Sequence, residues 1–331
     1  MRRIREAVSE LIRSFRRAPH KRAAHAEGRA VLEQLSREPA FLTEVLQSYV
    51  GRRDSLERGN YPVVAIPLET NPYFDLVVNC WIPLPTGRTD LSTKAIHHHG
   101  TLLLSTATIF GPGYEHWMFT RARPLPGSTT LYGMELVEAI RHGLHHVAFV
   151  DAHVPHLPVY PPELSITLAL WSDSRPTTLV NHAKRLPFFR GREAQLRSMA
   201  IRLGLRRTLA LKVAEGFDFH PLSDGFEVIP DRREFPLGPN EDHLHSVFHV
   251  LQRTGNEHLA NEIARHNQER PFCNQALFEE LLHRLRNATP IEGKLSAGHY
   301  DVPFANFTTA TIRDTLLATG RAAPTRVQHA S

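Results

Sequence analysis

Apolar residues recur with helical spacing over the first 58 residues of the chain. Ile4, Val8, Leu11 and Phe15 lie about one turn apart, and a second apolar run extends from Ala24 to Tyr49. Residues three or four positions apart share one face of an α-helix. The pattern therefore predicts amphipathic helices that cover one side of a larger core.

Short runs of β-branched and aromatic residues, separated by proline and glycine, replace the helical pattern from Tyr61 onward. The expected strands are Val63–Ile66, Phe74–Ile82, Ala95–Phe110, Glu115–Thr120, Val147–Val150 and Ile166–Trp171. Short strands with turn residues between them are typical of a β-barrel or sandwich and not of βαβ units. The fold class expected from this pattern is mainly β with added α-helices.

The strand pattern fades after about Arg175, and helical spacing returns. The expected helices are Glu193–Glu215, Asp242–Arg253, Glu257–Asn267, Asn274–Arg286 and Thr308–Thr319. This division predicts a helical segment at 1–58, a barrel at 59–175, a largely helical extension at 176–320 and a loose tail at 321–331.

Composition narrows the function classes. The net charge of +5 arises mainly from arginines and lysines near the amino terminus, on one face of the first expected helix. We interpret that face as solvated, and we expect no nucleic-acid partner. The chain shows no spanning apolar stretch and no signal peptide, and its 2 cysteines lack metal or redox spacing. Together these features predict a cytoplasmic protein.

Histidine is unusually frequent, with 21 in the chain, and the most informative group is Ile96-His97-His98-His99-Gly100. Side chains alternate along a strand, so His97 and His99 share one face while His98 faces the other way. Neutral imidazole is a common metal ligand. We therefore expect His97 and His99 to bind one divalent metal ion.

The spacing around these histidines resembles the first motif of the cupin family, which has His-x-His, then a glutamate, then a glycine that turns the chain. Gly111 occupies the glycine position, whereas Leu103 or Leu104 stands where the glutamate is expected. The resemblance implies a double-stranded β-helix, or jelly-roll, barrel with helices at both ends. In lacking this glutamate ligand, the chain resembles the three-histidine cupins.

The best-known group of three-histidine cupins is the cysteine dioxygenase (thiol dioxygenase) group. Its pattern of an apolar strand ending in Cys-Trp is similar to the strand that ends at Cys80 and Trp81. Two of its features are absent, because the early strand from Tyr61 has no arginine and Thr167 and Ala169 replace the expected histidine and tyrosine after Ser165. These departures argue against small amino-thiols as substrates.

The second cupin motif implies a third histidine ligand before the last strand. We favour His156, which follows a proline and precedes Tyr160 by four positions, and keep His153 and Glu115 as alternates. Further candidates for the catalytic site are Tyr160 as an aromatic wall or general base, and Arg121 and Arg123 as a clamp for an anionic substrate group.

Three neutral imidazoles leave the charge of a divalent ion undiminished and leave coordination positions open. The expected function is therefore a mononuclear non-haem metalloenzyme, an Fe(II)-dependent oxygenase acting on a small organic substrate with O2. Zinc, nickel or manganese would instead favour a lyase or isomerase with Tyr160 or Glu115 as base. A second alternative is a barrel that binds a small molecule without catalysis. An exposed edge strand would permit a homodimer.

Overall fold

The computed structural model describes residues 2–52, 55–56, 64–83, 96–159, 161–175, 215–220, 225–229, 241–269, 271–272, 274–294 and 314. Its helices are α1 (Arg2–Arg17), α2 (Lys21–Ser36), α3 (Phe41–Val50), α6 (Glu241–Arg253), α7 (Ala260–Glu269) and α8 (Gln275–Arg286). Its strands are β1 (Val64–Thr70), β2 (Asp75–Trp81), β3 (Ile96–His98), β4 (Leu102–Phe110), β5 (Tyr114–Phe119), β6 (Arg123–Pro124), β7 (Leu131–Gly133), β8 (Leu136–His142), β9 (Val147–Val150), β10 (His156–Val159), β11 (Ser165–Asp173), β12 (Glu215–His220) and β13 (Gly225–Ile229).

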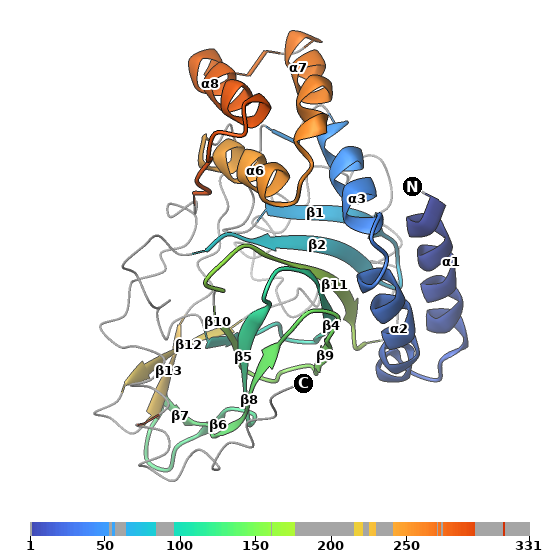
Figure 1. The fold of residues 1–331 in the computed structure, drawn as a ribbon. Coiled ribbons are helices and arrows are strands. Elements are labelled where there is room, and N and C mark those ends of the chain that lie inside the picture. Colours follow the sequence, from blue (N-terminus) through green and yellow to red (C-terminus); the bar gives the residue numbers. More distant parts are fainter. Residues whose placement is uncertain are drawn as a thin grey trace, which may run out of the picture.

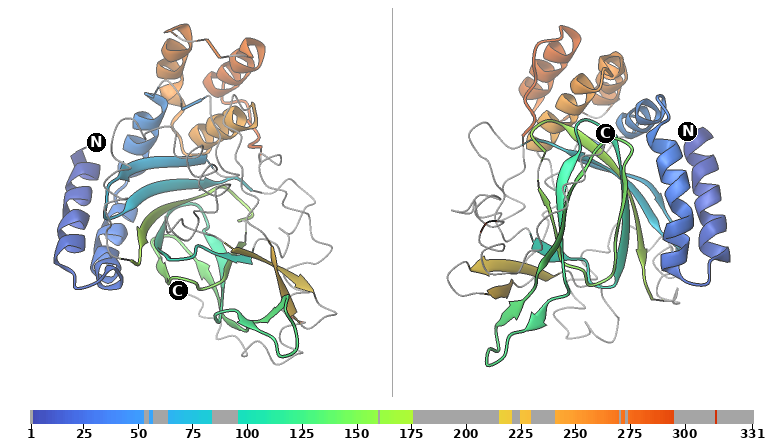
Figure 2. Two further views of the ribbon diagram at one scale, coloured as in Figure 1. Left: turned by 180° about the vertical axis from the view of Figure 1, so that it is seen from behind. Right: turned by 60° about the horizontal axis from the view of Figure 1, so that its bottom comes forward.

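The strands form two antiparallel sheets whose order identifies the fold. One sheet has the order β1-β2-β11-β4-β9, and the other has the order β6-β7-β13-β12-β3-β10-β5-β8. The strands β2-β11-β4-β9 face β3-β10-β5-β8, and the right-hand view of Figure 2 shows the two sheets opposite each other. Successive strands cross between the sheets in the order of a double-stranded β-helix, or jelly roll. The predicted cupin-type barrel with helices at both ends is confirmed.

Helices α2, α3 and α6 pack on the outer face of the β1-β2-β11-β4-β9 sheet, as Figure 1 shows. Val78 of β2 and Leu168 of β11 belong to one buried core with Leu32 of α2, Val45 of α3 and Phe248 of α6. Each of these side chains is 0% exposed, so the sheet removes the apolar stripes of α2, α3 and α6 from water. Segments from both ends of the chain therefore stabilise the same layer of the barrel.

A buried histidine joins α2 to this sheet. His25 is 2% exposed, with its Nδ1 2.8 Å from the Ser105 hydroxyl and its Nε2 2.9 Å from the Ser172 hydroxyl. Burial, together with the nearby Lys21 ammonium, lowers the pKa of His25 to about 4. His25 is therefore a neutral, hydrogen-bonded strut near pH 7.

Three local expectations differ from the structure. The single strand expected over Ala95–Phe110 is divided at Gly100, whose φ of 59° turns the chain between β3 and β4. The single helix expected over Ala24–Tyr49 is divided into α2 and α3. Strands also occur after residue 175, because β12 pairs with β3 and β13 pairs with β12.

Other expectations compare as follows. The helices expected near Asp242–Arg253 and Asn274–Arg286 are present as α6 and α8. The helix expected over Glu193–Glu215 lies outside the described residues except for Glu215, which begins β12. Of Thr308–Thr319 the structure describes residue 314 alone, which is helical. Within the described part of the chain, no helix combines the length and the apolar character needed to cross a membrane.

Candidate metal centre

The barrel brings together the three histidines that the sequence predicted as ligands. His97 of β3 lies opposite His156 of β10 in the antiparallel register, and His99 follows at the end of β3. One nitrogen from each of the three side chains lies within 4.8 Å of the other two. The Nε2 atoms of His97 and His99 are 2.9 Å apart, and the ring centroids of the trio are 4.6 to 4.7 Å apart. This group could hold a metal ion.

Neighbouring groups orient the rings. The Nδ1 of His156 donates a hydrogen bond of 3.2 Å to the carbonyl of Val154, which leaves the lone pair on Nε2. A backbone carbonyl commonly fixes a ligating histidine in this way. Burial lowers the pKa of His156 to about 4, although the bond to Val154 acts in the opposite direction. The rings of Trp171 and His99 are perpendicular, with centroids 4.6 Å apart.

Leucines stand where the cupin motif has its glutamate ligand, and both of these leucines are buried. Leu103 is fully buried. Leu104 packs with Val150 and Ala169 in a small core that Trp171 also contacts. The clustered group contains His97, His99 and His156 and no carboxylate. Three uncharged nitrogen donors are therefore the ligand set that the described residues offer.

The structure does not bring His153 into the group. His153 has a φ of 58° and an exposed side chain. Its backbone N–H donates to the carbonyl of Gly100 over 2.7 Å, and its ring lies 5.5 Å from that of His98. Because His98 alternates with His97 along β3, His153 lies with the opposite face of the strand. His156, and not His153, therefore lies in the cluster with His97 and His99.

Glu115 also lies away from the group. In the pairing of β10 with β5, Met118 lies opposite His156 and Trp117 lies opposite Leu157. Paired residues share a face, so Glu115, an even number of positions from Trp117, shares the face of Trp117 and not that of His156. The Glu115 carboxylate accepts a hydrogen bond of 2.6 Å from the Trp117 indole.

Two buried histidines near the group were missed as site residues. The His116 ring lies 5.2 Å from that of His156 and 4.8 Å from that of His142. Within the described part of the chain, Nδ1 of His116 and both ring nitrogens of His142 are buried without hydrogen-bond partners. Burial lowers the pKa of His142 to about 3 and that of His116 well below its usual range. The sequence could have indicated His116, because side chains alternate along β5 and His116 therefore faces the other way from Glu115. His142 could be found only from the pairing of β5 with β8.

The other predicted site residues lie elsewhere or outside the described residues. The exposed Arg121 donates to the carbonyl of Ala152 over 3.4 Å. Arg123 is exposed in β6, which pairs with β7. Tyr160 lies outside the described residues. Roles for these three residues in substrate binding or catalysis stay predictions.

Comparison with known proteins gives no family assignment. No protein-family model matches the chain. No curated protein matches it.

Solved structures show partial similarity. One contains the DMSP lyases RdDddP and RnDddQII, with 18% identity over 30% of this chain and 39% of that chain and a TM-score of 0.18. Another is a conserved protein with a double-stranded β-helix domain from Klebsiella pneumoniae subsp. pneumoniae, with 13% identity over 38% of this chain and 89% of that chain and a TM-score of 0.22.

A third similar structure is an oxalate decarboxylase variant from Bacillus subtilis, with 10% identity over 45% of this chain and 34% of that chain and a TM-score of 0.23. The matched region thus spans 39% of the DMSP lyase chain and 34% of the decarboxylase chain. The strand order and the histidine geometry define the protein as a cupin-type barrel with a three-histidine group suited to a metal ion.

Proposed function

We propose that the protein is a mononuclear non-haem metalloenzyme, an Fe(II)-dependent oxygenase that acts on a small organic substrate. The observation that carries the proposal is the convergence of His97, His99 and His156 without a carboxylate ligand. Imidazole nitrogen suits iron, zinc, nickel and copper. His97, His99 and His156 would hold the ion and leave coordination positions open for substrate and solvent, and Fe(II) bound there would supply activation of dioxygen.

The chain's own residues would hold the site rigid and partly dry. The bond from His156 to the Val154 carbonyl sets the direction of the Nε2 lone pair. Contact with Trp171 restricts rotation of the His99 ring. The small core of Leu104, Val150 and Ala169 adjoins Trp171, so one wall beside His99 is apolar. An apolar wall excludes water from the reacting groups.

The placement of Glu115 favours the oxygenase over the lyase or isomerase alternative. A lyase needs a general base within hydrogen-bond reach of the proton it removes. Glu115 was one of two predicted bases, and its carboxylate is bonded to Trp117 on the opposite face of β5. The other predicted base, Tyr160, lies outside the described residues. Arg121, Arg123 and Tyr160 enter the proposal as candidate contacts for the part of the substrate remote from the metal.

The test is metal analysis of the purified protein and of His97→Ala and His99→Ala, followed by measurement of oxygen consumption with candidate substrates. We expect about one iron per chain in the unmodified protein and loss of that iron in both variants. His153→Ala is the matched control, because its side chain is exposed outside the cluster, and it should keep the iron.

Three results would contradict the proposal in different ways. Tightly bound zinc, nickel or manganese without oxygen consumption would favour the lyase or isomerase. A folded protein that takes up no metal even when it is supplied would favour the barrel that binds a small molecule without catalysis. Equal metal content in His97→Ala and the unmodified protein would place the metal elsewhere.

A further inference from the structure

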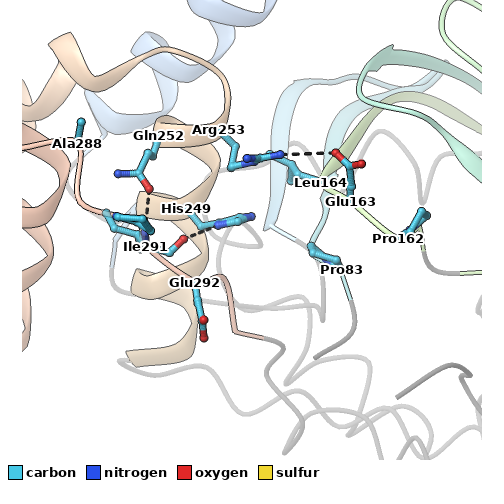
Figure 3. Close-up of a pocket in the computed structure, with 11 residues that line it drawn as sticks. Pro83, Pro162, Glu163, Leu164, His249, Gln252, Arg253, Ala288, Ile291 and Glu292 are labelled. Atoms are coloured by element: carbon cyan, nitrogen blue, oxygen red, sulfur yellow. Dashed lines mark hydrogen bonds and ion pairs between the residues drawn. The ribbon is translucent and has the colours of Figure 1, made fainter. Parts of the chain in front are cut away.

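A second site lies at the junction of the barrel and the carboxyl-terminal helices. A pocket of about 420 Å³ lies between α6, the segment 288–292 and the barrel residues Pro83 and Leu164, as Figure 3 shows. None of the three clustered histidines lines this pocket. Its size is in the range of small-molecule sites.

Hydrogen bonds from α6 fix the wall formed by segment 288–292. Gln252 accepts from the backbone N–H of Ile291 over 2.8 Å and donates to the carbonyl of Thr289 over 2.8 Å. Gly293 permits close packing there, because a Cβ at this position would lie 2.6 Å from Ile82 and 3.1 Å from the His249 ring. The pocket is therefore a built feature whose two sides are held together by specific contacts.

The ring of His249 presents an unused acceptor at this pocket. Its Nδ1 lies 2.7 Å from the carbonyl of Ile291, so Nδ1 carries the proton and Nε2 carries the lone pair. Nε2 is buried and has no hydrogen-bond partner among the residues that the structure describes, and His249 is 9% exposed. In Figure 3 the ring extends from α6 toward Pro83 and Leu164. Burial lowers the pKa of His249, which agrees with a neutral ring.

The charges at the rim are mainly acidic. Arg253 and Glu163 form an ion pair of 3.6 Å in which both side chains are more than half exposed, so these two charges largely offset each other. Glu292 is exposed and has no ion-pair partner among the described residues. The unmet groups of the pocket are thus a buried lone pair and a carboxylate, which both require a hydrogen-bond donor, and the carboxylate favours a positive charge.

We propose that this pocket binds a small organic ammonium ion with an apolar tail. An N–H of the ammonium group donates to Nε2 of His249, and the Glu292 carboxylate neutralises its charge. The tail lies against Pro83, Pro162 and Leu164, which line the barrel side of the pocket. The site is separate from the proposed metal centre and does not depend on it.

The test uses n-butylamine as the probe and isothermal titration calorimetry as the measurement on the full chain. Butyltrimethylammonium keeps the charge but has no N–H donor, and we expect it to bind about tenfold more weakly. Butyrate reverses the charge and should not bind. Equal affinity for n-butylamine, butyltrimethylammonium and butyrate would overturn the proposal.

Variants locate the probe on the protein. Glu292→Gln should weaken n-butylamine binding about fivefold or more, while Glu279→Gln, an exposed glutamate on α8 outside the pocket, should leave it unchanged. His249→Phe keeps a planar ring without the lone pair and should weaken binding about tenfold. Binding that survives both Glu292→Gln and His249→Phe would overturn the assignment of the site.

A double variant separates this site from the metal centre. His97→Ala with His99→Ala should bind n-butylamine as the unmodified chain does, whether or not the metal proposal holds. Loss of amine binding in that double variant would place the amine at the clustered histidines and overturn the inference.

Discussion

The barrel and α6 both present histidines at spacings typical of metal ligands, yet the structure uses them differently. His97 of β3 and His99, which directly follows β3, meet His156 from β10. In α6, His245 and His249 lie one helical turn apart, as in the zinc-binding helices of metalloproteases. The nitrogen Nδ1 of His249 is bonded to the Ile291 carbonyl, and the neighbouring His243 is bonded to Tyr49 and Ser55.

This difference shows that the spacing of histidines along the sequence is not sufficient to predict a metal site. Spacing places two imidazoles on one face of a strand or helix, but a metal site also needs a third donor from another element. In the barrel the register of β10 against β3 supplies His156. Among the described residues, α6 receives no such third donor, and no group of three ligands forms around it. Hydrogen bonds to carbonyls tie Nδ1 of His249 and the ring of His243 to neighbouring segments of the chain.

The largest expected effect is the loss of metal affinity when His156, the third nitrogen donor of the cluster, is removed. His156→Ala leaves two ligands, and we expect metal affinity to fall on the order of a thousandfold, because even the loss of an outer hydrogen-bond partner of a ligand costs about 10- to 100-fold. Metal titration with a competing chelator measures the change. His245→Ala on α6 is the matched control, and an equal loss of affinity in this control would show that the metal lies at the helix.

The structural role of buried histidines should appear as a pH dependence of stability. Above pH 6.5 His25 is neutral in both states, so it adds no pH dependence. As the pH falls from 6.5 to about 4, the unfolded chain binds a proton that folded His25 cannot bind, because burial lowers the folded pKa to about 4. The unfolding free energy should then decrease by about 3 kcal/mol, and the loss should level off below pH 4.

Urea denaturation of the unmodified protein and of His25→Gln at a series of pH values measures this contribution. The difference in unfolding free energy between the two proteins should shrink by about 3 kcal/mol between pH 7 and pH 4. Parallel pH curves for the two proteins would show that His25 can take up a proton in the folded state.

A smaller effect is expected from the structural histidine of α6. His243→Leu removes the contacts with the Tyr49 hydroxyl and the Ser55 carbonyl, at 3.0 and 2.9 Å, and leaves these buried groups with fewer partners. We expect a loss of about 2 kcal/mol in unfolding free energy with unchanged metal content. Denaturation and metal analysis on the same sample check both parts, and metal loss in a folded His243→Leu protein would contradict the structural role.

The local patterns of the sequence were sufficient for much of the fold. Alternation and turn residues predicted the barrel, and β9 has the bounds that the pattern predicted, Val147–Val150. Helical spacing predicted α6 and α8 to within a residue or two. These elements were predictable because burial of one face imposes a period on each segment by itself. Strands β12 and β13 were missed, since their pairing with β3 and with each other joins distant parts of the chain.

The candidate site also has features that the sequence predicted and features that depend on the tertiary structure. The sequence by itself determined that His97 and His99 point to one side, because alternation is a property of a single strand. The tertiary structure alone placed His156 and not His153 in the cluster, directed Glu115 toward Trp117, and brought His142 beside His116. Each of these outcomes depends on the register between strands, and a shift of one residue would reverse the face of every side chain.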